Sequence, residues 1–345
     1  MVDKIDLCSL EIYELEKIIL DMGEKKFRAK QIFEWINKRN TRDFSQMTNL
    51  SLQVRKKLQN KFYITQVDIL KEINCDDSTV KFLSKLDDSN VIESVLMKYS
   101  YGNTVCVSSQ VGCRMSCKFC ASTFNGLKRN LSTGEMCCQV YLANKISHVS
   151  NIVIMGSGEP LDNYDNVIKF IKIINSEAGL NIGQRHITLS TCGLVDKIYS
   201  LAQENLQITL AISLHAPNDF LRQKIMPVAN KYKINDIIKA CKFYFEKTKR
   251  RVTFEYVLID KLNDSDENAY ELASLLKNFP CHINLIPING VNGKDFKPSS
   301  IYRQNEFMKI ISSCGKNVTV RKKLGDNINA ACGQLRNSYI NKVGD

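Results

Sequence analysis

Short β-branched runs alternate with amphipathic segments through most of this chain, and this alternation restricts the fold more than any other feature. Strands are expected at residues 79–86, 91–97, 104–107, 152–155, 186–189, 208–213, 252–258, 282–286 and 318–320. Helices are expected between most of them, at residues 133–145, 164–174, 195–201, 234–245, 267–276 and 302–312. Such alternation is typical of parallel βα units. About six units favour an α/β fold, a partial (β/α)6 barrel, although periodicity alone leaves an open doubly wound sheet as the alternative.

The beginning of the chain has a different pattern. Apolar residues recur there at helical spacing in three short segments, containing Ile12, Leu15, Ile18 and Ile19, then Ile32, Phe33 and Ile36, then Leu52, Val54 and Leu58. We therefore expect a small helical accessory domain over residues 1–65, a strand-rich connector over 66–100 and the barrel core over 101–345. A chain of 345 residues with 44% hydrophobic content can bury one large core.

Positive charge is concentrated in the helical segment. The whole chain carries a net charge of +12, and residues 25–60 contain ten Lys and Arg against only Glu34 and Asp43. Such a block suits a surface that faces RNA or another polyanion. It is equally typical of a solvated helical face, and charge alone leaves both interpretations open.

The chain has the features expected of a cytoplasmic protein. No apolar run approaches the roughly 18 residues of a membrane span, and the N-terminus lacks the basic and apolar regions of a signal peptide. Its 13 cysteines are odd in number and widely spread, unlike a secreted disulfide framework. A reducing compartment is therefore expected, with metal or redox chemistry for a few of the thiols.

Three of these cysteines, Cys113, Cys117 and Cys120, have C-x3-C-x2-C spacing. Three thiolates can hold three irons of a 4Fe-4S cluster and leave the fourth iron open to a substrate or cofactor. A closed zinc site is the alternative, but it needs a fourth ligand. None of the four histidines lies within 25 residues, and the nearby Cys137 and Cys138 fall within a predicted helix. The spacing therefore favours an open iron-sulfur cluster.

Polar residues follow four of the predicted strands. Ligands of parallel α/β proteins bind at the carboxyl ends of the strands. Any one of these residues could be an ordinary turn or cap. Four groups in the same topological position instead predict one binding site, made by Gly156-Ser157-Gly158-Glu159-Pro160, Ser190-Thr191-Cys192, Ser213-Leu214-His215 and Asn289.

Residues around these motifs resemble a known family. The matching segments are 105–113, 155–160, 211–218 and 330–335, and the similarity extends from about residue 10 to 340 in one order. They are similar to the RlmN/Cfr family of radical S-adenosylmethionine (SAM) enzymes, which methylate an adenine of large-subunit ribosomal RNA. The RlmN branch also modifies tRNA.

The resemblance implies a role for individual residues. Cys113, Cys117 and Cys120 would hold a 4Fe-4S cluster whose open iron chelates SAM. Cys332 would be methylated and carry the methyl group, Cys106 would resolve the intermediate through a disulfide, and Glu93 would be the general base. Seven residues would contact SAM: Gly158, Glu159, Ser190, Ser213, Leu214, His215 and Asn289.

The chemistry explains why a carrier thiol is needed. The target carbon of adenine is electron-poor and cannot attack the methyl group of SAM, whereas a thiolate can. A second SAM, cleaved by one electron, would supply the radical that activates the methyl on Cys332. The resemblance therefore implies two SAM per turnover, a reductant such as flavodoxin or ferredoxin, 23S rRNA and tRNA as substrates, and a monomeric enzyme.

Two other functions remain open from the sequence. A non-catalytic RNA-binding protein with a metal cluster would explain the basic block, but not Gly158-Glu159 or Cys332. The Cfr branch, which methylates carbon 8 of adenine and confers antibiotic resistance, shares the catalytic residues. The segment 321–326 and the length of the N-terminal unit resemble the carbon-2 branch more closely.

Overall fold

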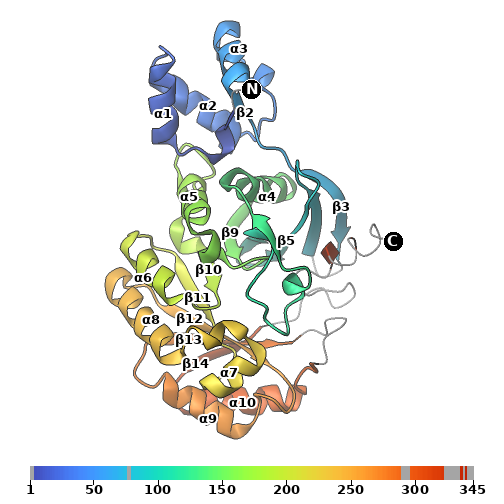
Figure 1. Cartoon of the computed structure of the whole chain (residues 1–345), viewed down its shortest axis with the longest axis vertical. Helices are drawn as coiled ribbons and strands as arrows, with labels where there is room; N and C mark the ends of the chain where they lie inside the picture. The colour runs from blue at the N-terminus through green and yellow to red at the C-terminus, as the bar shows by residue number, and fades with distance from the viewer. Residues whose placement is uncertain (1–3, 76–78, 289–295, 322–334, 337–338, 340–345) are drawn as a thin grey trace.

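The computed structural model describes residues 4–75, 79–288, 296–321, 335–336 and 339 of the chain (Figure 1). Ten strands form one sheet, in the order β14-β13-β12-β11-β10-β9-β6-β5-β4-β3. Their bounds are β3 Asp68–Asn74, β4 Thr79–Lys85, β5 Val91–Tyr99, β6 Gly102–Cys106, β9 Val149–Ile154, β10 Ile187–Thr191, β11 Thr209–Ser213, β12 Val252–Leu258, β13 Cys281–Pro287 and β14 Asn317–Val320. No helix in these ranges is long and apolar enough to cross a membrane.

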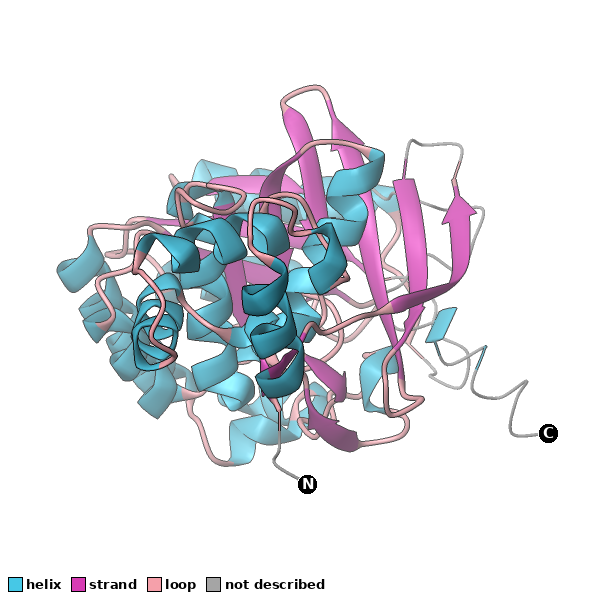
Figure 2. Ribbon diagram, turned by 90° about the horizontal axis from the view of Figure 1, so that it is seen from above, coloured by secondary structure: helices cyan, strands magenta, loops and turns pink. Residues whose placement is uncertain are grey.

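The sheet has a parallel part and an antiparallel part. From β6 to β14 every neighbouring pair is parallel, whereas β3, β4, β5 and β6 pair antiparallel. In Figure 2 the helices gather on one side of the sheet, and the strands of one edge extend away from them. The crossovers of the parallel part contain α4 Thr133–Ile146, α5 Tyr164–Asn175, α6 Val195–Gln203, α7 Asp219–Ile225, α8 Ile234–Thr248, α9 Asp266–Leu275 and α10 Ile301–Ser313.

This arrangement confirms the predicted partial (β/α)6 barrel, because six βα units lead from β6 to β14. Each predicted strand and helix is present. The helices form where apolar residues recur at helical spacing; in α5, for example, Val167, Phe170, Ile171 and Ile174 share the buried face. The structure adds β3, α7 and a hairpin of β7 Gln110–Gly112 with β8 Leu127–Asn130.

The N-terminal unit contains α1 Ile12–Asp21, α2 Phe27–Asn37 and α3 Leu52–Lys61, and it forms the top of the molecule in Figure 1. A short parallel pair, β1 Ile5–Asp6 with β2 Phe62–Tyr63, brings its two ends together. The strands β3, β4 and β5 belong to the same sheet as the barrel strands. The predicted division of the chain at residues 65 and 100 stays a prediction.

Close packing fixes the N-terminal unit to α4. The backbone N–H of Gly134 donates to Ser9 Oγ at 2.9 Å. A Cβ atom on Gly134 would lie 2.4 Å from Asp6 Oδ2 and 2.8 Å from Cys8 Cβ, so the two parts approach at a residue without a side chain. The hydroxyl of Tyr141 on α4 donates to Asn37 Oδ1 on α2, and both side chains are buried.

We expect Tyr141→Phe to weaken this junction. The substitution leaves the buried Asn37 Oδ1 without its donor, which costs about 1–3 kcal/mol in the free energy of unfolding. Urea titration of the whole chain measures the change. Tyr270→Phe, on the exposed face of α9, should change the value by less than about 0.5 kcal/mol. Equal effects of the two variants would contradict a junction held by this contact.

Candidate active site

The three cysteines lie on the loop between β7 and β8. The loop turns at Gly112, which has a φ of +81°, and a Cβ atom there would lie 1.9 Å from the carbonyl oxygen of Gly126. The backbone N–H of Cys113 donates to the same carbonyl at 3.0 Å. The Thr123 hydroxyl donates to the carbonyls of Cys117 and Cys120. These contacts fix the loop so that all three thiols line a cavity of about 340 Å³.

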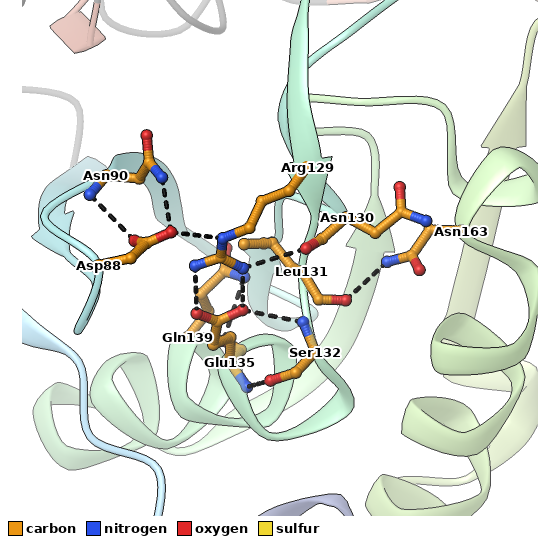
Figure 3. A network of polar contacts seen from close by, with 9 residues as sticks. All are labelled: Asp88, Asn90, Arg129, Asn130, Leu131, Ser132, Glu135, Gln139 and Asn163. Carbon is orange, nitrogen blue, oxygen red and sulfur yellow. Dashed lines mark hydrogen bonds and ion pairs between the residues drawn. The ribbon is translucent and has the colours of Figure 1, made fainter.

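A polar network supports this hairpin from outside the cavity (Figure 3). The Arg129 guanidinium, on β8, donates to Asp88 at 2.6 Å and to both oxygens of Glu135 at 2.8 Å. Glu135 also forms a capping box with Ser132 at the start of α4. Arg129 holds the pKa of the Asp88 carboxyl well below its usual range. The hairpin is thereby tied to α4 and to the turn between β4 and β5.

Cys113 and Cys117 are held as neutral thiols when no metal is bound. Burial raises the pKa of Cys113 to about 12 and raises the pKa of Cys117 as well. Within the described ranges no three His, Cys, Asp or Glu side chains converge to hold a single metal ion. A 4Fe-4S cluster needs no such convergence, because each thiolate binds a different iron. Three thiols on one loop beside an open cavity therefore fit this group.

The segment after β9 forms a second wall of the cavity. Gly158 has a φ of +108°, and a Cβ atom there would lie 2.6 Å from Gln110 Cβ. The buried carboxylate of Glu159 accepts the backbone N–H of Leu161 at 3.0 Å and that of Cys192 at 2.8 Å. Burial raises the pKa of Glu159. The carboxylate thus joins the ends of β9 and β10.

Two predicted serines meet a glutamate that sequence reasoning missed. Ser190 Oγ donates to Glu255 Oε2 at 2.6 Å, and Ser213 Oγ donates to the same oxygen at 3.3 Å. Glu255 lies on β12, is buried and lines the cavity. The available signal was one carboxylate inside the apolar run Val252–Leu258, since a charge in a buried strand needs partners.

His215 occupies a strained position after β11. Its φ is +60°, and the backbone N–H of Val257 donates to its Nδ1 at 3.0 Å, so the proton of the neutral ring is on Nε2. Burial lowers its pKa to about 3. The ring meets Phe119 of the cysteine loop edge-on, with 5.0 Å between ring centroids. The neighbouring Leu214 is buried but does not line the cavity.

The residues predicted for the methyl transfer have different placements. Cys106, at the end of β6, lines the cavity. Glu93 is buried on β5, where Lys81 Nζ lies 3.8 Å from its Oε1, and Lys81 itself lines the cavity. The backbone N–H of Arg336 donates to Glu93 Oε2 at 3.4 Å. The predicted Asn289 and Cys332 lie outside the described residues.

One cavity therefore collects most of the predicted site, from segments far apart in the chain. Its lining includes Cys106, Cys113, Cys117, Cys120, Gly158, Glu159, Ser190, Ser213 and His215, together with Lys81, Glu255 and Arg321, which sequence reasoning did not single out for the site.

Three cysteines on a loop at the carboxyl edge of a partial (β/α)6 barrel define the class of radical SAM enzymes. The model of the Radical SAM superfamily matches residues 107–273, and the model described as ribosomal RNA large subunit methyltransferase N-terminal domain matches residues 5–64. A solved radical SAM methyltransferase from Sphaerobacter thermophilus has a TM-score of 0.91 and 44% identity, covering 96% of this chain and 98% of its own.

Two relatives match this chain over nearly the full length of both sequences. A protein of Clostridium tetani, named probable dual-specificity RNA methyltransferase RlmN, is 53% identical over 99% of this chain and 98% of its own. A protein of Alkaliphilus oremlandii with the same name is 54% identical over 98% and 99%. The chain belongs to the RlmN family of radical SAM RNA methyltransferases. The family implies a 4Fe-4S cluster, SAM and an RNA substrate.

The pKa of His215 predicts a pH dependence of stability. The folded protein keeps the imidazole neutral down to about pH 3, whereas the unfolded chain binds a proton below about pH 6.5. Its contribution to the free energy of unfolding is complete above pH 6.5. It is lost at up to about 1.4 kcal/mol per pH unit between pH 6.5 and 3.

Urea titrations at pH 7.5, 6.5 and 5.5 measure this loss. His215→Asn keeps an acceptor for the Val257 N–H and tolerates a positive φ, and it should remove this part of the pH slope. His148→Asn, at an exposed histidine, should leave the slope unchanged. A His215 ring that protonates near pH 6 in the folded protein would contradict the assignment.

Proposed function

We propose that this enzyme methylates carbon 2 of an adenine in 23S rRNA, and also an adenine in tRNA, through a methylated Cys332. The observation that carries the proposal is the shared cavity, which brings Cys106 together with the three cysteines and the strand-end residues. Transfer through a cysteine carrier requires a site for SAM close to two thiols, the carrier and the resolving thiol.

We propose that Cys113, Cys117 and Cys120 hold the cluster, which supplies one electron to SAM when bound. Gly158 and Glu159, which line the cavity, would receive the amino end of SAM. Ser190, Ser213 and Asn289 supply polar contacts. His215 supports them through Nε2–H, with Leu214 fixing its turn.

The carrier chemistry follows from the thiols. The Cys332 thiolate attacks the methyl carbon of SAM, forming an S–C bond as the bond from that carbon to the SAM sulfur breaks and S-adenosylhomocysteine leaves. After the methyl carbon has lost a hydrogen atom and joined the adenine ring, and the adduct has given up one electron, Glu93 would remove the ring proton. The Cys106 thiolate would then attack the Cys332 sulfur, so that a disulfide forms as the bond from that sulfur to the transferred carbon breaks, and the carbon takes up a proton to become the methyl group. A reductant such as flavodoxin or ferredoxin supplies electrons, and reducing conditions regenerate both thiols.

Two contacts support placing Cys332 near Glu93 and Cys106. Arg336 Nε donates to the carbonyl of Val91 at 2.7 Å, and its backbone N–H donates to Glu93. Cys332 precedes Arg336 by four residues, a connection that spans at most about 14 Å. The anchor at Arg336 is near enough along the chain for the proposed carrier Cys332 to reach β5 and the adjacent β6.

The basic helices of the N-terminal unit are proposed to face the RNA. Lys25, Lys26 and Lys30 are exposed there, and Arg28 lies over the Phe27 ring at 4.8 Å, where the ring is half exposed. Exposed ammonium groups suit phosphate contact, and a guanidinium beside an exposed aromatic ring suits base stacking.

Mass spectrometry of 23S rRNA and tRNA tests the reaction. We expect 2-methyladenine to disappear in cells that lack this protein and to return when it is re-expressed. Cys332→Ala should fail to restore it, because no carrier thiol remains. Cys314→Ala, at an exposed cysteine that directly follows α10, should restore it fully. An 8-methyladenine product would contradict the carbon-2 assignment.

Cys106→Ala separates the two thiol roles. Without a resolving thiolate the bond between Cys332 and the methylated base cannot break, so this variant should accumulate a protein covalently joined to RNA. The double variant with Cys332→Ala should show no adduct. Free RNA product from Cys106→Ala at the wild-type rate would contradict the proposed resolving role.

Charge reversal tests the RNA-facing surface. Changing Lys25, Lys26 and Arg28 to Glu should weaken RNA binding at least tenfold and lower the salt slope of the binding constant by about one unit per lost phosphate contact. The matched control reverses the exposed Lys239, Lys242 and Lys247 on α8 and changes the net charge equally. Equal losses in the two variants would contradict a localised surface.

A further inference from the structure

Arg222 is a buried cation behind the active site. It lies on α7, is 0% exposed and is the largest fully buried side chain among the described residues. Its Nε donates to the carbonyl of Leu214 at 3.1 Å, one terminal nitrogen donates to the carbonyl of Tyr232 at 3.1 Å, and the other donates to that of Cys192 at 2.6 Å. Three chain segments are thus joined by one guanidinium.

All three hydrogen bonds of this guanidinium within the described residues go to carbonyl oxygens. Within the described ranges no carboxylate forms an ion pair with Arg222, and the nearby Asp219 accepts the backbone N–H of Ile234 instead. Burial lowers the pKa of Arg222. Guanidinium groups nevertheless stay protonated in proteins, so the positive charge is permanent. Burying such a charge costs free energy, and an apolar side chain would pack at this position without that cost.

The geometry connects this charge to the cysteine loop. The backbone N–H of Lys118 donates to the carbonyl of Ile225 at 2.9 Å, so the loop rests on the end of α7. Met226, the next residue, lines the cavity with Cys117 and Cys192. Arg222 itself donates to the carbonyl of Cys192, which lines the same cavity as Cys117.

We propose that Arg222 is a positioning residue whose fixed positive charge raises the reduction potential of the cluster held by Cys113, Cys117 and Cys120. This inference rests on the proposed function, because it needs the cluster at these three thiolates. Three thiolates give the site a net negative charge, and an added electron increases it. A buried cation stabilises the reduced form more than the oxidised form, since the interaction is weakly screened.

A purely structural role would have a different signature. As a structural tie, Arg222 would matter through its three hydrogen bonds, and a lysine, which cannot reach three carbonyls with one ammonium, would be as defective as a neutral residue. If Arg222 acts through its charge, lysine should replace it with little change in the reduction potential of the cluster. The two variants Arg222→Gln and Arg222→Lys therefore distinguish the two roles.

The test is an anaerobic redox titration of the reconstituted full chain, followed by electron paramagnetic resonance of the reduced cluster. Arg222→Gln should lower the ratio of reduced to oxidised cluster at least tenfold at a fixed potential, a shift of about 59 mV for one electron. Arg222→Lys should keep the ratio within about threefold of the wild type. Lys224→Gln removes an exposed charge from the same helix and should leave the ratio unchanged.

The outcomes separate the inference from the proposed function. A wild-type ratio in cluster-loaded Arg222→Gln would overturn the inference while leaving the cluster site intact. If Arg222→Gln does not fold, a tenfold or greater loss in Arg222→Lys would overturn it. A wild-type chain that takes up no cluster, or a Cys117→Ala chain that keeps a normal one, would overturn the proposed site together with the inference.

Discussion

Parallel pairing of β9, β10, β11 and β12 is the constraint on which the rest of the structure depends. It brings the carboxyl ends of these strands to one edge, where side chains from distant parts of the chain share one cavity. Two buried carboxylates then hold the strand ends together. Glu159 accepts a backbone N–H from the end of β10, and Glu255 accepts the hydroxyls of Ser190 and Ser213. Because β10 takes part in both sets of contacts, its misalignment would disturb both.

Several ionisable groups of the site are buried, and burial disfavours their charged forms. Burial raises the pKa of the Cys113 and Glu159 side chains and lowers that of His215. The buried guanidinium of Arg222, behind the site, adds a positive charge. In such surroundings electrostatic interactions are weakly screened. A site built in this way suits radical chemistry, because the surroundings need little rearrangement when an electron arrives.

The sequence was sufficient to predict the barrel and most of the site, because both depend on local patterns. Strand and helix alternate visibly, and the polar strand ends and the C-x3-C-x2-C spacing can be read without a partner. The residues that were missed depend on contacts across the fold. β3 is exposed almost throughout and lacks apolar alternation, and α7 has only seven residues. Nothing near Lys81 or Arg222 in sequence shows that either is buried beside the site, and the apolar run around Glu255 does not reveal its partners. Cys332 was predicted by resemblance alone.

The rigid junction at Gly134 has a consequence for substrate choice. Because the N-terminal unit packs on α4 without space for even one methyl group, the basic helices and the cavity stand at a set separation. Under the proposed function, this separation is the distance across which an RNA has to present phosphates to the helices and its target adenine to the cavity. Because such a requirement concerns a distance and not the nucleotide sequence in between, it is compatible with the two proposed substrates, 23S rRNA and tRNA.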